Sequence, residues 1–217
     1  MRFLITAGPT REHFDPVRFL SNPSTGKMGF ALAEAARKFS RQVYVVSGPT
    51  QLAKPRGVQL ASIVSAQEMF EAVKRRAGDT DIVLMAAAVC DWRPARVLPR
   101  KKKKRSRPET IRLVRTKDIL AWLGRHKPAR QILVGFAAET HQLLRFARAK
   151  LKRKNLDLVV ANRVSGNDTG FAADTNRVIL LWRNGQVERL PKASKRQVSL
   201  WIVQRVIKYA RRVHQKD

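Results

Sequence analysis

The sequence contains a single cysteine, Cys90, among 217 residues, which excludes a disulfide framework and any zinc site built from several cysteines. It also lacks a long apolar run. The longest, Ile82–Cys90, has nine residues, whereas a membrane-spanning helix needs about 20. The N-terminal run Phe3–Ala7 is too short for the core of a secretion signal, which spans about 7–15 residues. We therefore expect a cytoplasmic enzyme or binding protein that does not enter a membrane.

Acidic residues are scarce. The chain has 16 Asp and Glu against 45 Lys and Arg, so its formal charge is +29. Residues 92–217 carry +25 of this charge and residues 1–91 carry +4. Anionic substrates would account for a few of these cations and nucleic acid for many, so charge alone does not choose between them. The hydrophobic fraction of 44% is high enough for one folded domain spanning residues 1–217.

Short apolar segments alternate with helix-like segments along the chain. The predicted strands are Phe3–Ala7, Val43–Ser47, Ile82–Val89, Ile132–Phe136 and Leu156–Ala161. The predicted helices, with apolar residues three and four apart, are Met28–Phe39, Ala66–Ala77, Asp118–Arg125 and Thr140–Lys154. This alternation predicts a Rossmann-like three-layer α/β fold. In such a fold a parallel sheet has helices on both faces and binds ligands beyond the carboxyl ends of its strands.

Two regions break the alternation. Arg177–Trp182 and Gln186–Leu190 flank Asn184–Gly185, which predicts an antiparallel C-terminal hairpin appendage with a type I′ turn. Ser194 then caps a last helix whose apolar stripe consists of Val198, Trp201, Ile202, Val206, Tyr209 and Val213. Residues 93–110 contain three prolines and the basic run Lys101–Arg105, and we expect a mobile flap there.

The loop after the first strand carries neither common phosphate-binding fingerprint. The dinucleotide pattern G-x-G-x-x-G is absent, and Gly26-Lys27 is followed by methionine, which breaks the Walker A pattern. Ser24, Thr25 and Gly26 nevertheless precede a predicted helix, whose first N–H groups attract anions. An ordinary Ser or Thr helix cap explains the same pattern, so both interpretations stay open.

Other candidate ligands are ambiguous when each is taken alone. Asp91 follows a strand and could meet a ribose hydroxyl or a metal, or only cap a turn. Phe136 could stack on a base or fill the core. Lys150 and Lys154 lie four residues apart on a predicted helix and could meet a triphosphate, although cations near a helix C-terminus are favourable anyway. The four histidines show no metal-binding spacing, so the metal ligands remain unassigned.

In chain order these segments form a recognisable series. The blocks are T-A-G-P-T-R-E, D-P-V-R-F-L-S-N-P-S-T-G-K-M-G-F-A-L-A, V-S-G-P-T, A-A-A-V-C-D-W-R-P, K-D-I-L, V-G-F-A-A-E-T, K-L-K-R-K-N-L-D-L-V-V-A-N and a late D-T-N, with a Lys-rich flap among them. From Ile5 to about Ser194 the chain resembles the bacterial phosphopantothenoylcysteine synthetase family, the second half of the bifunctional coenzyme A biosynthesis flavoprotein.

The resemblance implies ligation of 4′-phosphopantothenate with L-cysteine. In bacterial members CTP converts the carboxylate into an acyl-cytidylate and releases pyrophosphate, and the cysteine amine then displaces CMP. The resemblance also implies Mg²⁺ with the CTP, a homodimer, a stand-alone synthetase without flavin, and a separate flavoprotein decarboxylase in the pathway. The same ligation with ATP is the first alternative. A basic nucleic-acid-binding protein is the second, although no reader motif is present, so we expect nucleic acid to bind only non-specifically.

The same blocks imply the site residues. Asn22 would orient the acyl group, and Lys101 on the flap would close on the intermediate. The phosphorylated substrate would contact Gly8, Asn22, Ser24, Thr25, Gly26, Lys27 and Ala88. The nucleotide would contact Ala86, Ala87, Asp91, Lys101, Lys117, Asp118, Ile119, Leu120, Phe136, Lys150 and Lys154.

The chain departs from the family pattern in three places. The flap motif K-I-K-K is K-K-K-K here, so the flap register could slip by one residue and Lys101 is one candidate among four lysines. Lys117 stands where proline is usual, which leaves backbone recognition of the cytosine edge less rigid. Cys90 and Trp92 replace Ala and Tyr beside Asp91, and we expect no change in the chemistry.

Overall fold

The computed structural model describes residues 1–104, 108–163 and 173–215. Its largest element is an eight-stranded sheet in the order β13-β12-β10-β9-β6-β1-β4-β5. The six strands from β10 to β5 are parallel, and β12 and β13 add an antiparallel edge. The strands are β1 (Phe3–Ala7), β4 (Val43–Ser47), β5 (Gln59–Ser62), β6 (Ile82–Met85), β9 (Ile132–Glu139), β10 (Leu158–Arg163), β12 (Val178–Trp182) and β13 (Val187–Arg189).

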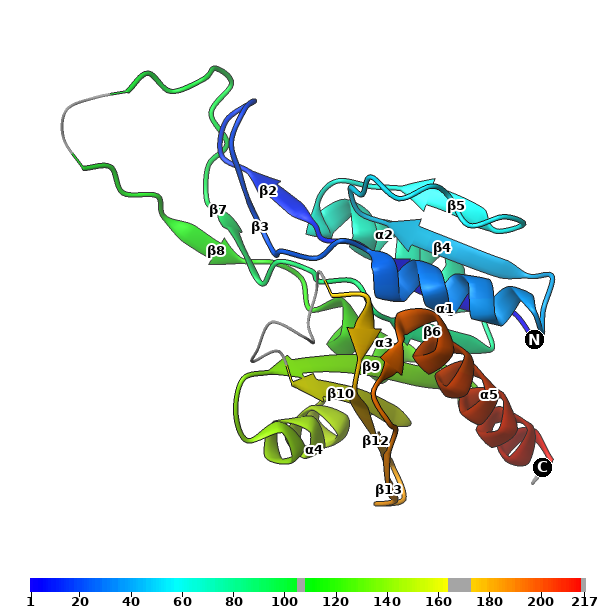
Figure 1. Ribbon diagram of the computed structural model, residues 1–217. Helices are drawn as coiled ribbons and strands as arrows, with labels where there is room; N and C mark the ends of the chain where they lie inside the picture. Colours follow the sequence, from blue (N-terminus) through cyan, green and yellow to red (C-terminus); the bar gives the residue numbers. More distant parts are fainter. Residues whose placement is uncertain (105–107, 164–172, 216–217) are drawn as a thin grey trace.

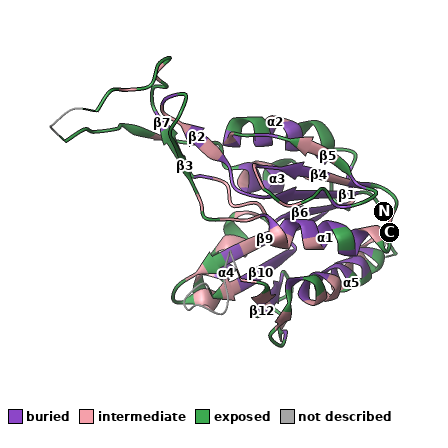
Figure 2. Ribbon diagram, turned by 45° about the horizontal axis from the view of Figure 1, so that its top comes forward, coloured by how far each residue is buried: buried purple, intermediate pink, exposed green. Residues whose placement is uncertain are grey.

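Helices cover both faces of this sheet, which confirms the predicted three-layer α/β fold (Figure 1). α1 (Lys27–Arg37) and α5 (Lys195–His214) pack on the face that carries Phe3 and Ile5 of β1. α2 (Ala66–Ala77), α3 (Ile119–His126) and α4 (Leu143–Arg153) pack on the face that carries Leu4. Successive side chains of a strand point to opposite faces, so one short apolar strand supplies both cores, and Figure 2 shows the central strands buried.

Most predicted elements are present, but several of their boundaries differ from the prediction, by one to four residues. The strand predicted to reach Val89 ends at Met85, because the chain turns there and only Ala88 still bridges to Pro9. The helix predicted from Thr140 starts at Leu143, since β9 continues to Glu139. β5 was not predicted: it is an edge strand whose residues are only partly buried, so its apolar pattern is weak.

The predicted hairpin joins the main sheet, because β12 pairs with β10. Its turn is not type I′: among the described non-glycine residues only Gln142 and Asn155 have positive φ, so Asn184 does not. Instead Gly185 alone takes a positive φ of 88°, and its N–H donates to the Trp182 carbonyl. A three-residue loop of this kind ends on a left-handed glycine.

Two short hairpins project from one end of the sheet and lie side by side (Figure 1). One consists of β2 (Arg11–His13) and β3 (Phe19–Ser21), and the other of β7 (Trp92–Pro94) and β8 (Leu113–Arg115). The predicted flap is the far end of this second hairpin, and its residues 105–107 lie outside the described residues. A last pair, β11 (Thr175–Asn176) with β14 (Ala193–Ser194), holds the start of α5.

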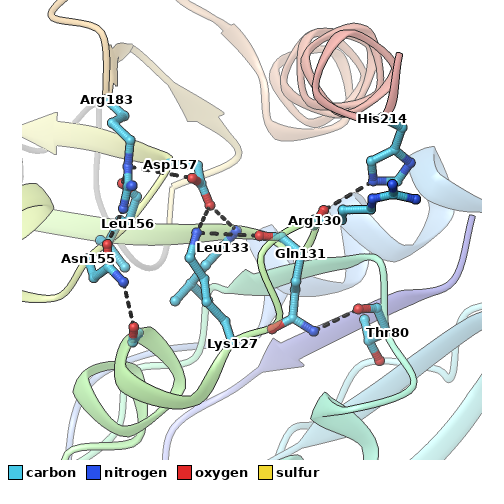
Figure 3. A network of polar contacts seen from close by, with 11 residues as sticks. Thr80, Lys127, Arg130, Gln131, Leu133, Asn155, Leu156, Asp157, Arg183 and His214 are labelled. Atoms are coloured by element: carbon cyan, nitrogen blue, oxygen red, sulfur yellow. Dashed lines mark hydrogen bonds and ion pairs between the residues drawn. The ribbon is translucent and has the colours of Figure 1, made fainter. Parts of the chain in front are cut away.

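A polar network ties the amino-terminal ends of β9 and β10 together (Figure 3). The Asp157 carboxylate accepts hydrogen bonds from Lys127 Nζ at 2.5 Å and from the Leu133 N–H at 2.7 Å. The guanidinium of Arg183, from the β12–β13 turn, lies 3.6 Å from the same carboxylate. Folds of this kind bind ligands beyond the carboxyl ends of the strands, whereas this network lies at the amino-terminal ends, so we assign it to the stability of the sheet. Within the described chain, no helix combines the length and the apolar character needed to cross a bilayer.

Candidate active site

A cleft of about 310 Å³ opens at the carboxyl ends of the parallel strands. The loop after β6 passes beside it, and the N-terminal ends of α1, α3 and α5 and the side chains of α4 surround it. The predicted site residues that line the cleft are Asn22, Ser24, Gly26, Lys27, Ala86, Ala87, Ala88, Asp91, Lys117, Asp118, Ile119, Leu120, Phe136, Lys150 and Lys154. Segments more than 100 residues apart in the chain therefore meet in one hollow.

Asn22 is fixed against the loop that follows β6. Its amide nitrogen donates to the carbonyl oxygens of Ala88 and Val89, both at 3.1 Å. Since both donors point at backbone oxygens, Oδ1 is the atom that the side chain can present to a ligand. Asn22 is therefore held as a hydrogen-bond acceptor in the cleft.

The N-terminus of α1 forms one end of the cleft. The N-cap is Gly26, with φ of 84° and no side-chain cap, so the Ser or Thr cap considered from the sequence is not made. A Cβ on Gly29 would lie 2.5 Å from Cβ of Ala7, so glycine is what lets α1 approach β1 this closely. The first N–H groups of the helix and the ammonium of Lys27 consequently lie where an anion would be stabilised.

The other end of the cleft is built from α3 and α4. Lys154 donates to the Asp118 carboxylate, which also caps α3 by accepting the Ala121 N–H at 2.9 Å. Burial opposes ionisation of Asp118, but these hydrogen bonds outweigh it and hold its pKa below the usual value. Lys150 Nζ donates to the carbonyl of Phe136 at 2.5 Å, and burial together with neighbouring Lys154 lowers its pKa. In the first turn of α3, Ile119 and Leu120 have N–H groups without an intrahelical acceptor.

Several residues that line the cleft were not predicted: Met28, Gly29, Met85, Val89, Ala138, Asn162, Asn176 and Lys195. Asn162 and Asn176 end the V-V-A-N and D-T-N blocks, which were the signals that could have identified them. Lys195 had no signal beyond its place after the predicted cap Ser194. It is 6% exposed, and burial and the nearby Lys27 lower its pKa to about 8.

Of the predicted residues in the described ranges, Gly8, Thr25 and Lys101 do not line the cleft. Gly8 is buried in a turn with φ of 72°. The carbonyl of Thr25 accepts a hydrogen bond from the Thr50 hydroxyl at 2.8 Å. Lys101 is exposed on the flap, which extends along the projecting hairpins and away from the sheet (Figure 1).

The flap is attached to the β2–β3 hairpin at Lys102. The Lys102 N–H donates to the Asp15 carboxylate at 3.3 Å, and Arg18 donates to the Lys102 carbonyl at 3.2 Å. Asp15 is fully buried; burial opposes its ionisation, but hydrogen bonds from three backbone N–H groups and the charge of Arg18 hold its pKa below the usual value. These contacts hold the neighbouring Lys101 outside the cleft.

Cys90 is buried, and burial raises the pKa of its thiol, which fits the absence of any role assigned to it from the sequence. Trp92 is 47% exposed on β7, with Arg115 over its ring. In the part of the chain that the structure describes, no group of three or more His, Cys, Asp or Glu side chains could hold a metal ion.

A family model and the curated relatives of this chain identify the same protein family. The family model of the DNA/pantothenate metabolism flavoprotein C-terminal domain matches residues 1–209. The coenzyme A biosynthesis bifunctional protein CoaBC of Bacillus subtilis is 50% identical over 204 residues, which are 94% of this chain and 50% of that protein. The chain thus spans about half the length of the curated relatives that it matches.

Solved structures with the same fold belong to related proteins. The crystal structure of the C-terminal domain of a CoaBC protein has 41% sequence identity and a TM-score of 0.80, covering 94% of this chain and 93% of that domain. A complex of a Cab2 mutant with phosphopantothenate-cysteine has a TM-score of 0.79 over 100% of this chain and 89% of that one. At 20% identity, this second likeness shows the shared fold alone.

Proposed function

The chain belongs to the DNA/pantothenate metabolism flavoprotein C-terminal domain family, and on this premise we propose that it ligates 4′-phosphopantothenate to L-cysteine, using CTP. The observation that carries the proposal is a single cleft with lysines at both ends: Lys27 and Lys195 at one, and Lys117, Lys150 and Lys154 at the other. A reaction that joins a phosphorylated acid to a nucleotide must hold two anions close together, which needs separate cationic ends.

The chemistry explains why a nucleotide is needed. A carboxylate is a poor electrophile, so its oxygen first attacks the α-phosphorus of CTP, and the bond to pyrophosphate breaks. The resulting acyl-cytidylate has CMP as a leaving group. The amine nitrogen of cysteine then attacks the acyl carbon, the bond to the cytidylate oxygen breaks, and the amine loses a proton to solvent or buffer.

The cleft geometry supports a role for each end. The N-terminus of α1, with Ser24, Gly26 and Lys27, would hold the phosphate of the acid. Lys150 and Lys154 would hold the triphosphate, and the first turn of α3 would present backbone N–H groups to the base. Asn22 lies beside the strand-end loop, with Oδ1 available to orient the acyl group or the incoming amine.

Mg²⁺ belongs to this proposal as a companion of the triphosphate, whose oxygens it would neutralise. Among the described residues Asp91 offers a cleft-lining carboxylate, whereas Asp118 is engaged by Lys154 and by α3. One carboxylate together with substrate phosphates is a usual environment for Mg²⁺. No flavin is assigned to this chain, and a separate flavoprotein decarboxylase would act on its product, which retains the cysteine carboxylate.

We also place the homodimer in the proposal, because apolar side chains gather on the projecting hairpins. Among the described residues ten large hydrophobic side chains are exposed, and seven of them lie on the two hairpins and their loops: Val17, Phe19, Leu20, Trp92, Val97, Ile111 and Leu113. Figure 2 shows these hairpins as largely exposed segments standing clear of the sheet. An apolar patch of this kind favours association with a second copy of the chain.

Pyrophosphate release tests the function. Purified protein would be given 4′-phosphopantothenate with CTP or with ATP, before and after addition of cysteine, and the product identified by mass. We expect release with CTP and cysteine-dependent formation of the amide. If pyrophosphate is released with ATP and not with CTP, ATP takes the place of CTP in the proposal. If the protein releases no pyrophosphate, forms no product and binds nucleic acid in a salt-sensitive manner, the nucleic-acid-binding alternative is favoured.

A further inference from the structure

A second cavity, of about 610 Å³, opens between α1, the loop that joins β4 to β5, and the first turns of α5. Twelve described residues line it, and none of them lines the cleft. Two of its sides are the packed helices α1 and α5, which lie next to each other in Figure 1. We call this cavity the basic groove, because five of its twelve lining residues are cations: Arg37, Lys38, Lys54, Arg56 and Arg196.

The basic groove is more basic than the chain as a whole. Lys and Arg make up 45 of the 217 residues of the chain but five of the twelve in the groove, where Glu34 is the one carboxylate. Helix dipoles explain only part of this charge: a cation is favourable at the end of α1, where Arg37 lies, but not in the first turn of α5, where Arg196 lies. The fold therefore brings like charges from three segments together, and a bound anion would reduce their repulsion.

The wall of the basic groove is formed before any ligand binds. Pro55 of the loop and Ala35 of α1 both line the groove and are buried. Gly57 has φ of 73°, and a Cβ on it would lie 2.8 Å from Nε of Arg37, so glycine allows the loop to approach α1 this closely. The Arg37 guanidinium also donates to the Ser40 carbonyl at 2.9 Å. The loop and this guanidinium are therefore in place beforehand, which reduces the entropy lost on binding.

Cations from three separate segments suit a ligand whose negative charge extends over several atoms. Guanidinium groups bind phosphate oxygens through paired hydrogen bonds, and a chain of linked phosphates can reach more of the five cations than one phosphate can. The volume of the groove lies within the range of small-ligand sites, about 300–1,000 Å³. We propose that the basic groove is a second anion site, which binds a small ligand with two or more linked phosphate groups. This site lies outside the cleft, and its existence does not depend on the ligase function.

Arg56 and Arg196 allow the basic groove to be altered without altering the cleft. Both side chains are exposed, and they come from two different segments, the loop and α5. The neighbouring Lys195 is buried and lines the cleft, whereas Arg196 lines the groove. We therefore choose the double variant Arg56→Gln/Arg196→Gln, with Lys54→Gln as an independent variant on the loop.

The matched control is Lys74→Gln/Arg75→Gln. Both residues are exposed on α2, which packs on the other face of the sheet, and neither lines the groove or the cleft. This control loses the same two charges, so it measures the general attraction of a basic protein for anions. The probe is inorganic tripolyphosphate. The readout is the amide NMR signals of residues 53–57, which report on the groove and not on the cleft, where the proposed substrates bind.

We expect tripolyphosphate to shift the amide signals of residues 53–57 in a saturable manner. The affinity measured from these signals should fall about tenfold or more in Arg56→Gln/Arg196→Gln, since two charge-assisted hydrogen bonds are lost, and about threefold or more in Lys54→Gln. The control should stay within about twofold of the wild type, because salt screens charges on the other face of the sheet. Absence of a saturable shift would overturn the proposal, as would an equal loss of affinity in the control.

Two further probes identify the kind of ligand. Inorganic phosphate should bind the groove about tenfold more weakly than tripolyphosphate, because it reaches fewer cations, and equal affinities would contradict the requirement for linked phosphates. A short single-stranded oligonucleotide carries its phosphates in a polymer. Weaker binding of the oligonucleotide than of tripolyphosphate supports a small-ligand site. If the oligonucleotide shifts the same signals and binds more tightly, the groove belongs to a nucleic-acid surface and the small-ligand assignment is wrong.

Discussion

Asp157 allows the stability of the sheet to be perturbed without touching the cleft. Its carboxylate lies at the amino-terminal ends of β9 and β10, and the cleft lies at their carboxyl ends. Lys127 and Asp157 side chains are each 9% exposed and 2.5 Å apart, so the pair is nearly buried. Asp157→Asn removes the negative charge, keeps the shape, and leaves the Lys127 ammonium without its counterion.

The expected loss follows from this burial. Breaking a buried ion pair by removing one partner costs about 3–5 kcal/mol, because the remaining charge is desolvated without compensation. The lower end applies here, since Lys127 keeps a contact of 3.4 Å with the Gln131 carbonyl. For a chain of this size, about 3 kcal/mol corresponds to a decrease in melting temperature of roughly 6–12 °C.

The assay is thermal unfolding of both proteins, with pyrophosphate release measured at 25 °C. Glu71→Gln is the matched control, because its pair with Lys117 is 3.7 Å long and both side chains are well exposed, so the change should cost less than about 1 kcal/mol. We expect near-normal release from Asp157→Asn below its melting transition. A melting temperature within about 2 °C of the wild type would refute the reasoning.

Three further predictions concern the site. Asn22→Asp replaces the NH2 group, which donates to two carbonyls, by one carboxylate oxygen that cannot donate. Turnover should therefore fall about 30-fold or more, from about 2 kcal/mol of lost hydrogen bonding; near-normal turnover would remove Asn22 from the mechanism. We expect the flap to close on the cleft during turnover and to carry Lys101 inward, so Lys101→Gln should lower pyrophosphate release more than Lys103→Gln; equal effects would show that the flap register is different. Gly29→Ala should lower the free energy of unfolding by about 1–3 kcal/mol in urea titrations, because its Cβ would clash, whereas Gly78→Ala, with nothing within 4 Å, should be neutral.

The sequence predicted the main sheet and its helices well because those features are local. The strands β1 and β4 and the helix α2 have the predicted bounds, since an apolar run between polar breaks, or an apolar stripe three and four residues apart, is enough to specify each. The short pairs β2–β3 and β7–β8 were missed, because each strand has only three residues, too few for an apolar pattern; β3, β7 and β8 are also largely exposed, and β2 consists of polar residues.

The candidate site was predicted in composition but not in arrangement. The family blocks contain Asn22, Asp91 and Lys154, and the alternation of strands and helices predicts that such loops meet at one edge of the sheet; all three line the cleft. The direction of a side chain is not contained in such blocks. That Asn22 turns both N–H groups to the backbone follows only from the position of the loop after β6.

Fold class, family and most of the residues in the cleft follow from the linear chain, because periodicity and ordered motifs are local properties. The entry of Lys195 into the cleft beside Lys27, and the position of Lys101 outside it, become apparent only in the folded chain. Both positions depend on long-range packing, which no local pattern contains. Pairing of β11 with β14 carries Lys195 inward, and contacts from Asp15 and Arg18 hold the flap outward.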